Sequence, residues 1–329
     1  MKRFLALILA AGGTLALYAQ LPAGAPVGAP AGAPAGMPPM GAGGPPAPVD
    51  TSFVKTKFLD LAYAPVSKTQ TLDIYLPNSG KGPYPVIITV HGGAFAFGDN
   101  RGPELAVGLK GLERGYAVVG VNYRLSGEAI FPAAIEDVKA AIRFLRANAA
   151  KYGLDPGRFA LWGSSAGGNL VSLAGTSGDV ADFKNPKLGN EMVSDRVQAV
   201  VDWYGPIDFT AMDGQFKASG IAGQVHDSAD SFESKYLGAQ ITTVPALVAK
   251  TNPATYIDAK DPPFFIQHGT ADATIPTRQS RDFAARLAKI IGIDKVFFEA
   301  IEGAGHGGAR FETPENLSKV LDFLDGRLK

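Results

Sequence analysis

One serine of this chain lies in the stretch GSSAG, residues 163–167, where two glycines flank it at the spacing G-x-S-x-G. An apolar run, RFALWG, leads into the motif, and a helix-like run, GGNLVSLAG, follows. A strand that turns sharply into a helix through residues without a Cβ raises the serine hydroxyl above the edge of a sheet. The motif is short and also fits a turn serine, so the role of Ser165 depends on whether the chain supplies a base and an acid.

The base and the acid must follow the serine, because in sheets of this kind the nucleophile, acid and histidine come in that chain order. A serine hydroxyl is an effective nucleophile only when a base accepts its proton. Of the four histidines, only His306, in EGAGHGGA, comes late enough. Asp272, beyond the run FFIQ, is the preferred acid that orients this base. Asp208 is the second choice, and Glu302 stands too close to His306 along the chain.

Acyl transfer also needs N–H donors for the negative charge that develops on the carbonyl oxygen. The loop VHGGAF, residues 90–95, ends an apolar run, and its small residues can turn their N–H groups inward. One further donor is expected directly after the nucleophile. The predicted oxyanion hole therefore consists of Gly92, Gly93, Ala94 and Ala166.

The remaining histidines and the nearby aromatic residues have less specific patterns. His91 and His268 are expected to hold the loops in which they lie, and His226 is expected to be exposed and inert. Several aromatic side chains stand beside the motifs, where a substrate pocket and ordinary core packing are equally good interpretations. They are Phe95, Trp203 and Tyr204 as pocket walls, with Phe97 as a second aromatic of the oxyanion loop.

The elements that must position these residues follow from the hydrophobic pattern. The runs YPVIITV, YAVVGV, RFALWG, AVVDW and FFIQ lack polar alternation, which is typical of parallel strands covered on both faces. Helical periodicity separates or follows them in residues 131–153, 277–292 and 314–329. Two earlier runs, 53–63 and 70–77, precede any helix. The expected fold class is α/β, a mostly parallel, doubly wound sheet with antiparallel N-terminal edge strands.

Glycine clusters follow three of the expected strands, at residues 91–93, 163–168 and 303–308. In such sheets the functional groups lie beyond the carboxyl ends of the strands. The three clusters therefore predict a backbone shaped around one site at that edge.

Composition excludes several classes of function. The 329 residues, 46% hydrophobic, suffice for one large core, and the absence of cysteine excludes disulfides, thiolate zinc sites and a cysteine nucleophile. Lys and Arg together number 31, as do Asp and Glu, so no basic surface for nucleic acid is indicated. No metal-binding or cofactor-binding motif is found, and the oligomeric state is left open.

The N-terminal segment has the pattern of an export signal. Lys2 and Arg3 precede the apolar run 4–17, and Ala19 offers a small residue for cleavage. The run is shorter than the roughly 20 residues of a membrane span, so cleavage without stable membrane insertion is preferred over an anchor. Pro, Ala and Gly dominate the next stretch, which has nothing to bury. We expect a signal peptide at 1–19, a disordered linker at 20–50 and a catalytic domain at 51–329, secreted or periplasmic.

The chain resembles the α/β-hydrolases of the esterase and lipase type, within them the bacterial feruloyl-esterase-like esterases and the hormone-sensitive-lipase group. The resemblance covers about residues 53–329. It is carried by HGGAF at 91–95, VNYRL at 121–125, FPAAIEDVKAAIRFLRANA at 131–149, DPGRFALWGSSAGG at 155–168, VDWYGPID at 201–208, HGTAD at 268–272 and GAGHG at 303–307. It implies the α/β-hydrolase fold and a serine carboxylesterase without metal or organic cofactor. The implied substrates are short acyl or aryl esters, on a small molecule or linked to plant polysaccharide.

The chain departs from the lipase-like group at two places. That group often has a third glycine where this chain has Ala94. It also carries a helical cap before the HGG loop, whereas here strand-like residues precede that loop, so a lid would have to come from residues 209–258.

Three other functions fit parts of the pattern. A prolyl-oligopeptidase-like serine peptidase shares the chain order of the three residues, but such enzymes usually carry a β-propeller, and no repeats of that kind occur. An arylformamidase also fits the order. A hydrolase fold that serves as a binding module would have lost the three residues, and all of them are present.

Overall fold

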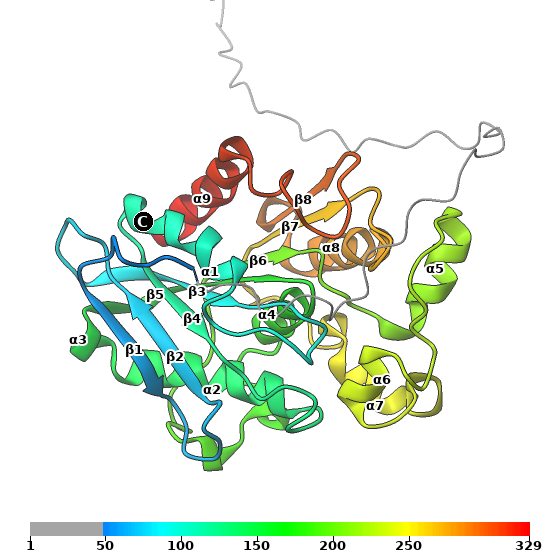
Figure 1. The fold of residues 1–329 in the computed structure, drawn as a ribbon, viewed down its shortest axis with the longest axis horizontal. Coiled ribbons are helices and arrows are strands. Elements are labelled where there is room, and N and C mark those ends of the chain that lie inside the picture. Colours follow the sequence, from blue (N-terminus) through cyan, green and yellow to red (C-terminus); the bar gives the residue numbers. More distant parts are fainter. Residues whose placement is uncertain (1–48) are drawn as a thin grey trace, which may run out of the picture. The chain divides into compact units, whose positions relative to one another are not determined.

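The computed structural model describes residues 49–329, so the predicted signal peptide and nearly all of the predicted linker lie outside the described residues. The described part contains an eight-stranded sheet with helices on both faces (Figure 1). The strands are β1 (Lys57–Ala62), β2 (Thr71–Tyr75), β3 (Tyr84–Val90), β4 (Ala117–Val121), β5 (Leu154–Ser164), β6 (Ala199–Trp203), β7 (Phe264–Gly269) and β8 (Val296–Ile301). Helices that contact the sheet include α1 (Pro103–Gly108), α2 (Ala133–Ala147), α4 (Ala166–Thr176), α8 (Arg278–Ile291) and α9 (Pro314–Leu328).

The order of strands in the sheet is β1-β2-β4-β3-β5-β6-β7-β8. β2 pairs antiparallel with both β1 and β4, and every pair from β4 onwards is parallel. The predicted parallel sheet with an antiparallel N-terminal edge is confirmed. Because the parallel strands share one direction, their carboxyl ends meet at the same edge of the sheet.

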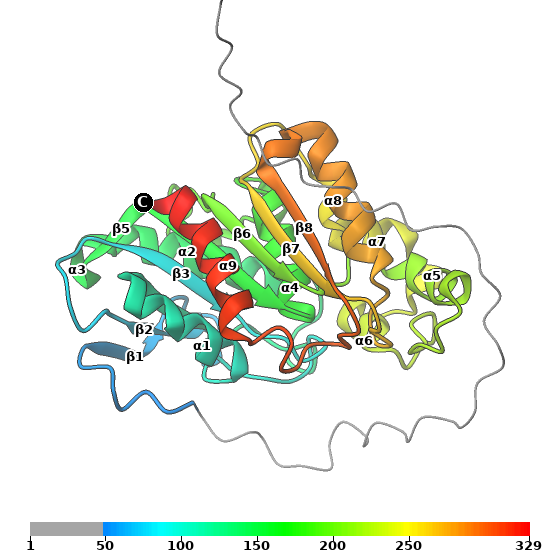
Figure 2. The ribbon, with the colours of Figure 1, turned by 90° about the horizontal axis from the view of Figure 1, so that it is seen from above.

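Side chains of the central strands alternate between two hydrophobic clusters, which explains their uninterrupted apolar pattern. On β3, Val86 and Ile88 pack with residues of α2, α4 and α8, while Ile87 packs with residues of α9. Figure 2 shows α1 and α9 together on one face of the sheet. Two covering layers thus leave no polar face on these strands.

The run 131–153 folds as two helices rather than one. α2 ends at Ala147, and the next residue, Asn148, caps it by donating a hydrogen bond of 2.8 Å from Nδ2 to the carbonyl of Phe144. The short α3 (Ala149–Tyr152) follows, and Gly153, with φ +68°, ends it. Within residues 49–329, no helix combines the length and the apolar character that crossing a membrane requires.

Residues 209–258 form an insertion between β6 and β7 that contains α5 (Met212–Ser219), α6 (Phe232–Leu237) and α7 (Pro245–Thr251). The sequence pattern appeared irregular because these helices are only six to eight residues long. The insertion is nevertheless packed into the protein, since Tyr236 is 1% exposed and stacks on Phe95 with 3.9 Å between ring centroids.

Candidate active site

Ser165 stands at the sharp turn between β5 and α4, with φ +54° and ψ −123°. A non-glycine residue in this region is strained and persists only when its surroundings fix it. The Ser165 N–H donates a hydrogen bond of 2.9 Å to the carbonyl of Trp203 on β6. A Cβ on Gly163 would overlap the carbonyl oxygen of Gly167, and one on Gly167 would overlap that of Val90. Close backbone approach therefore requires both glycines of the motif.

The structure brings the three residues predicted as nucleophile, base and acid into one hydrogen-bonded row. His306 Nε2 lies 2.8 Å from Ser165 Oγ, and His306 Nδ1 lies 2.8 Å from Asp272 Oδ2. The carboxylate can only accept, so Nδ1 carries the proton and Nε2 accepts the serine hydroxyl. The His306 side chain is 19% exposed and that of Asp272 is fully buried.

The two alternative acids do not contact His306. Asp208 Oδ1 accepts from the Thr210 hydroxyl at 2.9 Å, which makes it a local turn residue. Glu302 is exposed, its backbone carbonyl accepts from Arg310 at 2.9 Å, and the carboxylate that pairs with His306 is that of Asp272.

Asp272 is saturated with donors. Its Oδ1 accepts the N–H groups of Thr274 at 2.7 Å and Ile275 at 2.9 Å. Its Oδ2 receives His306 Nδ1 and lies 3.2 Å from His268 Nε2. Burial raises the pKa of Asp272, but the hydrogen bonds from His268 and His306 outweigh burial and hold that pKa well below its usual range. Asp272 is therefore a carboxylate at neutral pH.

Backbone hydrogen bonds join the acid loop after β7 to the histidine loop after β8. Thr270 N–H donates to Ile301 O at 3.1 Å, and Ala271 N–H donates to Ala304 O at 2.9 Å. Gly303 N–H donates to the Thr270 hydroxyl at 2.8 Å. These bonds fix the distance between acid and base independently of their side chains.

The prediction for Gly92 is wrong, since its N–H donates to Glu104 Oε1 at 3.0 Å and is not free for an oxyanion. Gly93 and Ala94 have positive φ, +102° and +53°, and neither N–H donates to another group of residues 49–329. The Ala166 N–H, in the first turn of α4, is likewise unpaired within that part of the chain. Three of the four predicted donors thus remain available.

Glu104 is a residue of this region that sequence reasoning missed. Its Oε1 accepts both the Gly92 N–H and the Ser164 hydroxyl, the latter at 2.5 Å. The carboxylate, from α1, therefore connects the loop after β3 with the turn after β5. The helix that carries Glu104 was not predicted from the sequence, and an acidic residue in the first turn of a helix is in any case too common to indicate a role.

His226 was expected to be exposed and is instead 1% exposed. Its Nδ1 lies 3.0 Å from Glu233 Oε1 of α6, and its Nε2 donates to the Thr274 carbonyl at 2.9 Å. The insertion folds over this residue and is thereby joined to the acid loop. His91 behaves as expected, since its Nδ1 lies 2.8 Å from Gly92 O and its ring stacks on Tyr123.

The aromatic residues divide between packing and the site. Phe95 is 2% exposed against Tyr236, and Trp203, 4% exposed, donates from Nε1 to Gln267 Oε1 at 2.7 Å, so both are packing residues and not pocket walls. Tyr204 packs on His306 with 4.8 Å between ring centroids. Phe97 is 51% exposed beside the oxyanion loop.

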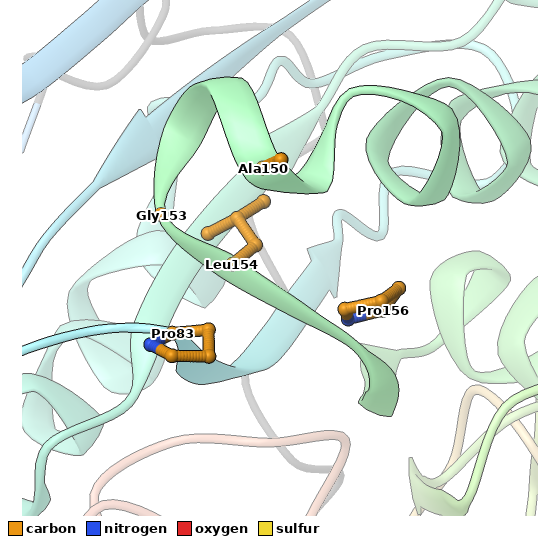
Figure 3. A pocket seen from close by; sticks show the side chains of 5 residues that line it. All are labelled: Pro83, Ala150, Gly153, Leu154 and Pro156. Carbon is orange, nitrogen blue, oxygen red and sulfur yellow. The ribbon is translucent and has the colours of Figure 1, made fainter.

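A hollow of about 460 Å³ lies at the opposite edge of the sheet, where β3 and β5 begin (Figure 3). Its lining consists of Pro83, Ala150, Gly153, Leu154 and Pro156. None of these side chains can transfer a proton or attack a carbonyl, so this hollow is not the candidate site. Within residues 49–329, no group of three or more His, Asp or Glu side chains is arranged to hold a metal ion.

A family model, curated proteins and solved structures all match this chain. The BD-FAE family model matches residues 72–287. Esterase LipQ of Mycobacterium tuberculosis is 32% identical over 273 residues, which are 80% of this chain and 61% of LipQ. The structure titled bifunctional GH43-CE of Bacteroides eggerthii has a TM-score of 0.75 at 36% identity, over 83% of this chain and 35% of its own.

A truncated form of a carbohydrate esterase from gut microbiota has a TM-score of 0.77 at 30% identity, over 85% of this chain and 98% of its own. This chain therefore spans less than two thirds of the length of LipQ and about a third of the bifunctional protein, but nearly all of the truncated esterase.

Proposed function

Because this chain belongs to the BD-FAE family and has the α/β-hydrolase fold, we propose that it is a serine carboxylesterase that works through an acyl-enzyme. The observation that carries the proposal is the hydrogen-bonded row from Ser165 through His306 to Asp272. These three residues form the catalytic triad. The relatives above are named esterases, which favours ester hydrolysis over the peptidase, arylformamidase and binding-module alternatives.

The first half of the reaction forms the acyl-enzyme. The Ser165 hydroxyl gives its proton to His306 Nε2 while Oγ attacks the carbonyl carbon of the ester. Asp272 stabilises the resulting imidazolium through the proton on Nδ1 and stays ionised, because its pKa lies well below the usual range. The tetrahedral intermediate then collapses, the carbon–oxygen bond to the alcohol breaks, and His306 returns the proton to the departing alkoxide.

The oxyanion is stabilised by N–H groups that are unpaired among the described residues. Ala166 supplies one donor from the helix N-terminus, and Gly93 and Ala94 supply the others from the loop after β3. In the second half of the reaction, His306 accepts a proton from water, the hydroxide attacks the acyl carbon, and Ser165 leaves with its proton restored.

The proposed substrate is a short acyl or aryl ester, and the polysaccharide-linked form is favoured. The structural relative that this chain covers over nearly its whole length is titled a carbohydrate esterase from gut microbiota, and the other is titled bifunctional GH43-CE. Phe97 offers an exposed ring next to the oxyanion loop, edge-on to Phe232 of the insertion at 5.8 Å. An exposed aromatic face of this kind can pack against a sugar or an aryl ring.

We further propose that the chain is exported, with residues 1–19 removed and residues 20–50 acting as a tether. The support is the charge and hydropathy pattern of the N-terminal segment, which lies outside the described residues. An enzyme outside the cytoplasm would meet polysaccharide esters that do not enter cells.

The test is hydrolysis of p-nitrophenyl esters of increasing acyl length, methyl ferulate and acetylated xylan by the purified chain and by Ser165→Ala. We expect turnover of short esters and a loss of at least about 10⁴-fold in the variant. Equal thermal unfolding of both proteins would show that the loss is chemical. Undiminished turnover by a folded Ser165→Ala protein would refute the assignment.

A further inference from the structure

A second histidine contacts the carboxylate of Asp272. His268, at the end of β7, is fully buried, and its Nε2 lies 3.0 Å from Ile275 O and 3.2 Å from Asp272 Oδ2. The mechanism above does not use this ring, which has no contact with Ser165. The residue opens the sequence HGTAD, whose aspartate is the acid.

The partners of His268 determine its tautomer. Ile275 O can only accept, so Nε2 must carry a proton, and the same nitrogen lies 3.2 Å from Asp272 Oδ2. On the other side of the ring, Nδ1 lies 2.7 Å from the hydroxyl of Ser280 in α8. In the neutral ring, Nδ1 then accepts a hydrogen bond from the Ser280 hydroxyl, so both ring nitrogens have hydrogen-bond partners. Ser280 thus holds the ring in the orientation that presents Nε2–H to Asp272.

Asp272 Oδ2 consequently lies between two imidazoles in opposite tautomers. His306 donates from Nδ1 and gains a second proton during the reaction, whereas His268 Nε2–H, which donates to Ile275 O, lies 3.2 Å from the carboxylate oxygen. The Oδ1 atom is already fixed by two backbone N–H groups. The donor from His268 therefore sets both the direction of the carboxylate and how much of its negative charge His306 experiences.

We propose that His268 is a positioning residue of this active site, which uses its Nε2–H to orient Asp272 and to moderate its charge toward His306. The inference rests on the proposed esterase function. The alternative is that His268 serves only as a packing residue beside α8.

Two substitutions separate these roles. In His268→Gln, the amide nitrogen reaches the place of Nε2 and has two N–H groups, one for Ile275 O and one for Asp272. In His268→Asn, the shorter amide can still accept the Ser280 hydroxyl but does not reach Asp272. Each variant loses part of the ring, so loss of packing affects both. Only the asparagine variant loses the donor.

The measurements are kcat and the pH profile of kcat/KM on a short p-nitrophenyl ester for the full chain and both variants, with thermal unfolding as a check of the fold. For His268→Asn we expect kcat about tenfold lower, the loss that corresponds to one hydrogen bond to a charged group. The acidic limb of its profile should move to higher pH by about one unit. Without the His268 donor, Asp272 presents more negative charge to His306 and so stabilises the protonated form of that ring. His268→Gln should keep the wild-type limb and most of kcat.

A second measurement needs neither a variant nor turnover. Long-range ¹H–¹⁵N spectra of the wild-type chain at pH 7 should show His268 as the Nε2–H tautomer. The Nδ1–H tautomer, or equal losses in both variants with unshifted acidic limbs, would overturn the proposal. Absence of ester turnover in the wild-type protein would instead refute the esterase function on which the proposal rests, and the tautomer would then test only whether Nε2–H faces Asp272.

Discussion

Asp202, on β6, is a buried carboxyl group whose ionisation should lower the stability of the fold. It is fully buried, and burial raises its pKa to about 7 although Ser172 Oγ, at 2.7 Å, and Gly205 N, at 2.9 Å, both donate to it. In the unfolded chain the pKa of an aspartate is about 3.9. Between these two values the native state binds more protons than the unfolded state, so the free energy of unfolding falls as pH rises through this window.

The magnitude follows from the difference in pKa of about 3 units. Each unit corresponds to about 1.36 kcal/mol, so ionised Asp202 lowers the free energy of unfolding by on the order of 3 to 4 kcal/mol at pH 8. Below pH 4 this penalty disappears. Asp202→Asn keeps the shape and both contacts, because its Oδ1 can accept the Gly205 N–H and its Nδ2 can donate to the Ser172 hydroxyl.

The assay is urea unfolding of the wild type and Asp202→Asn at pH 5 and pH 8, followed by tryptophan fluorescence. We expect the variant to be more stable by about 3 to 4 kcal/mol at pH 8 but by only about 1 to 2 kcal/mol at pH 5, where the aspartate of the unfolded chain is already largely ionised. All other titrating groups are common to both proteins and cancel in the comparison. A difference in unfolding free energy that is the same at both pH values would refute the argument, because it would show that Asp202 does not titrate in this range.

Two further predictions concern the oxyanion loop and the N-terminal segment. Glu104→Ala removes the acceptor shared by Gly92 and Ser164, so kcat on a short ester should fall about 100-fold with little change in KM. Glu104→Gln keeps a carbonyl acceptor and should retain most of kcat, and equal losses in the two variants would contradict this role. Mass spectrometry of cell fractions should find a chain that begins after Ala19 outside the cytoplasm, whereas an intact chain confined to the cytoplasm would disprove export.

Site residues are predicted most reliably from the sequence where a recognisable motif lies at the end of a predicted strand. Ser165 has flanking glycines and an apolar run before it, and His306 and Asp272 follow at the ends of the last two strands. Since the carboxyl ends of parallel strands meet at one edge, the sheet alone brings these residues together.

Contacts between segments that lie far apart along the chain could not be predicted from the sequence. Glu104 meets Ser164 across 60 residues, and His226 meets Thr274 across 48. Neither pair belongs to a pattern of adjacent residues, because each depends on how a short helix or the insertion packs. The same limit explains Gly92, whose conformational freedom was evident but whose N–H partner lies on a helix that the pattern did not predict.

Backbone strain explains why the site is only partly predictable from local preferences. Within residues 49–329, seven non-glycine residues have positive φ, and four of them lie here: Ala94, Phe95, Ser165 and Tyr204. Such conformations cost of order 1–3 kcal/mol each and need external support. Ser165 and Tyr204 receive it from adjacent strands, since their N–H groups donate to Trp203 O and Gln267 O.

The oxyanion loop receives its support from a different part of the chain. Phe95 O accepts the Ser126 N–H at 2.8 Å, and the Phe95 ring stacks on Tyr236 of the insertion. Residues that pattern reasoning treats as a separate lid therefore help to hold the loop that carries the Ala94 donor. Changes in the insertion should consequently affect the chemical step as well as substrate access, because the same side chains that bound the site also fix its strained backbone.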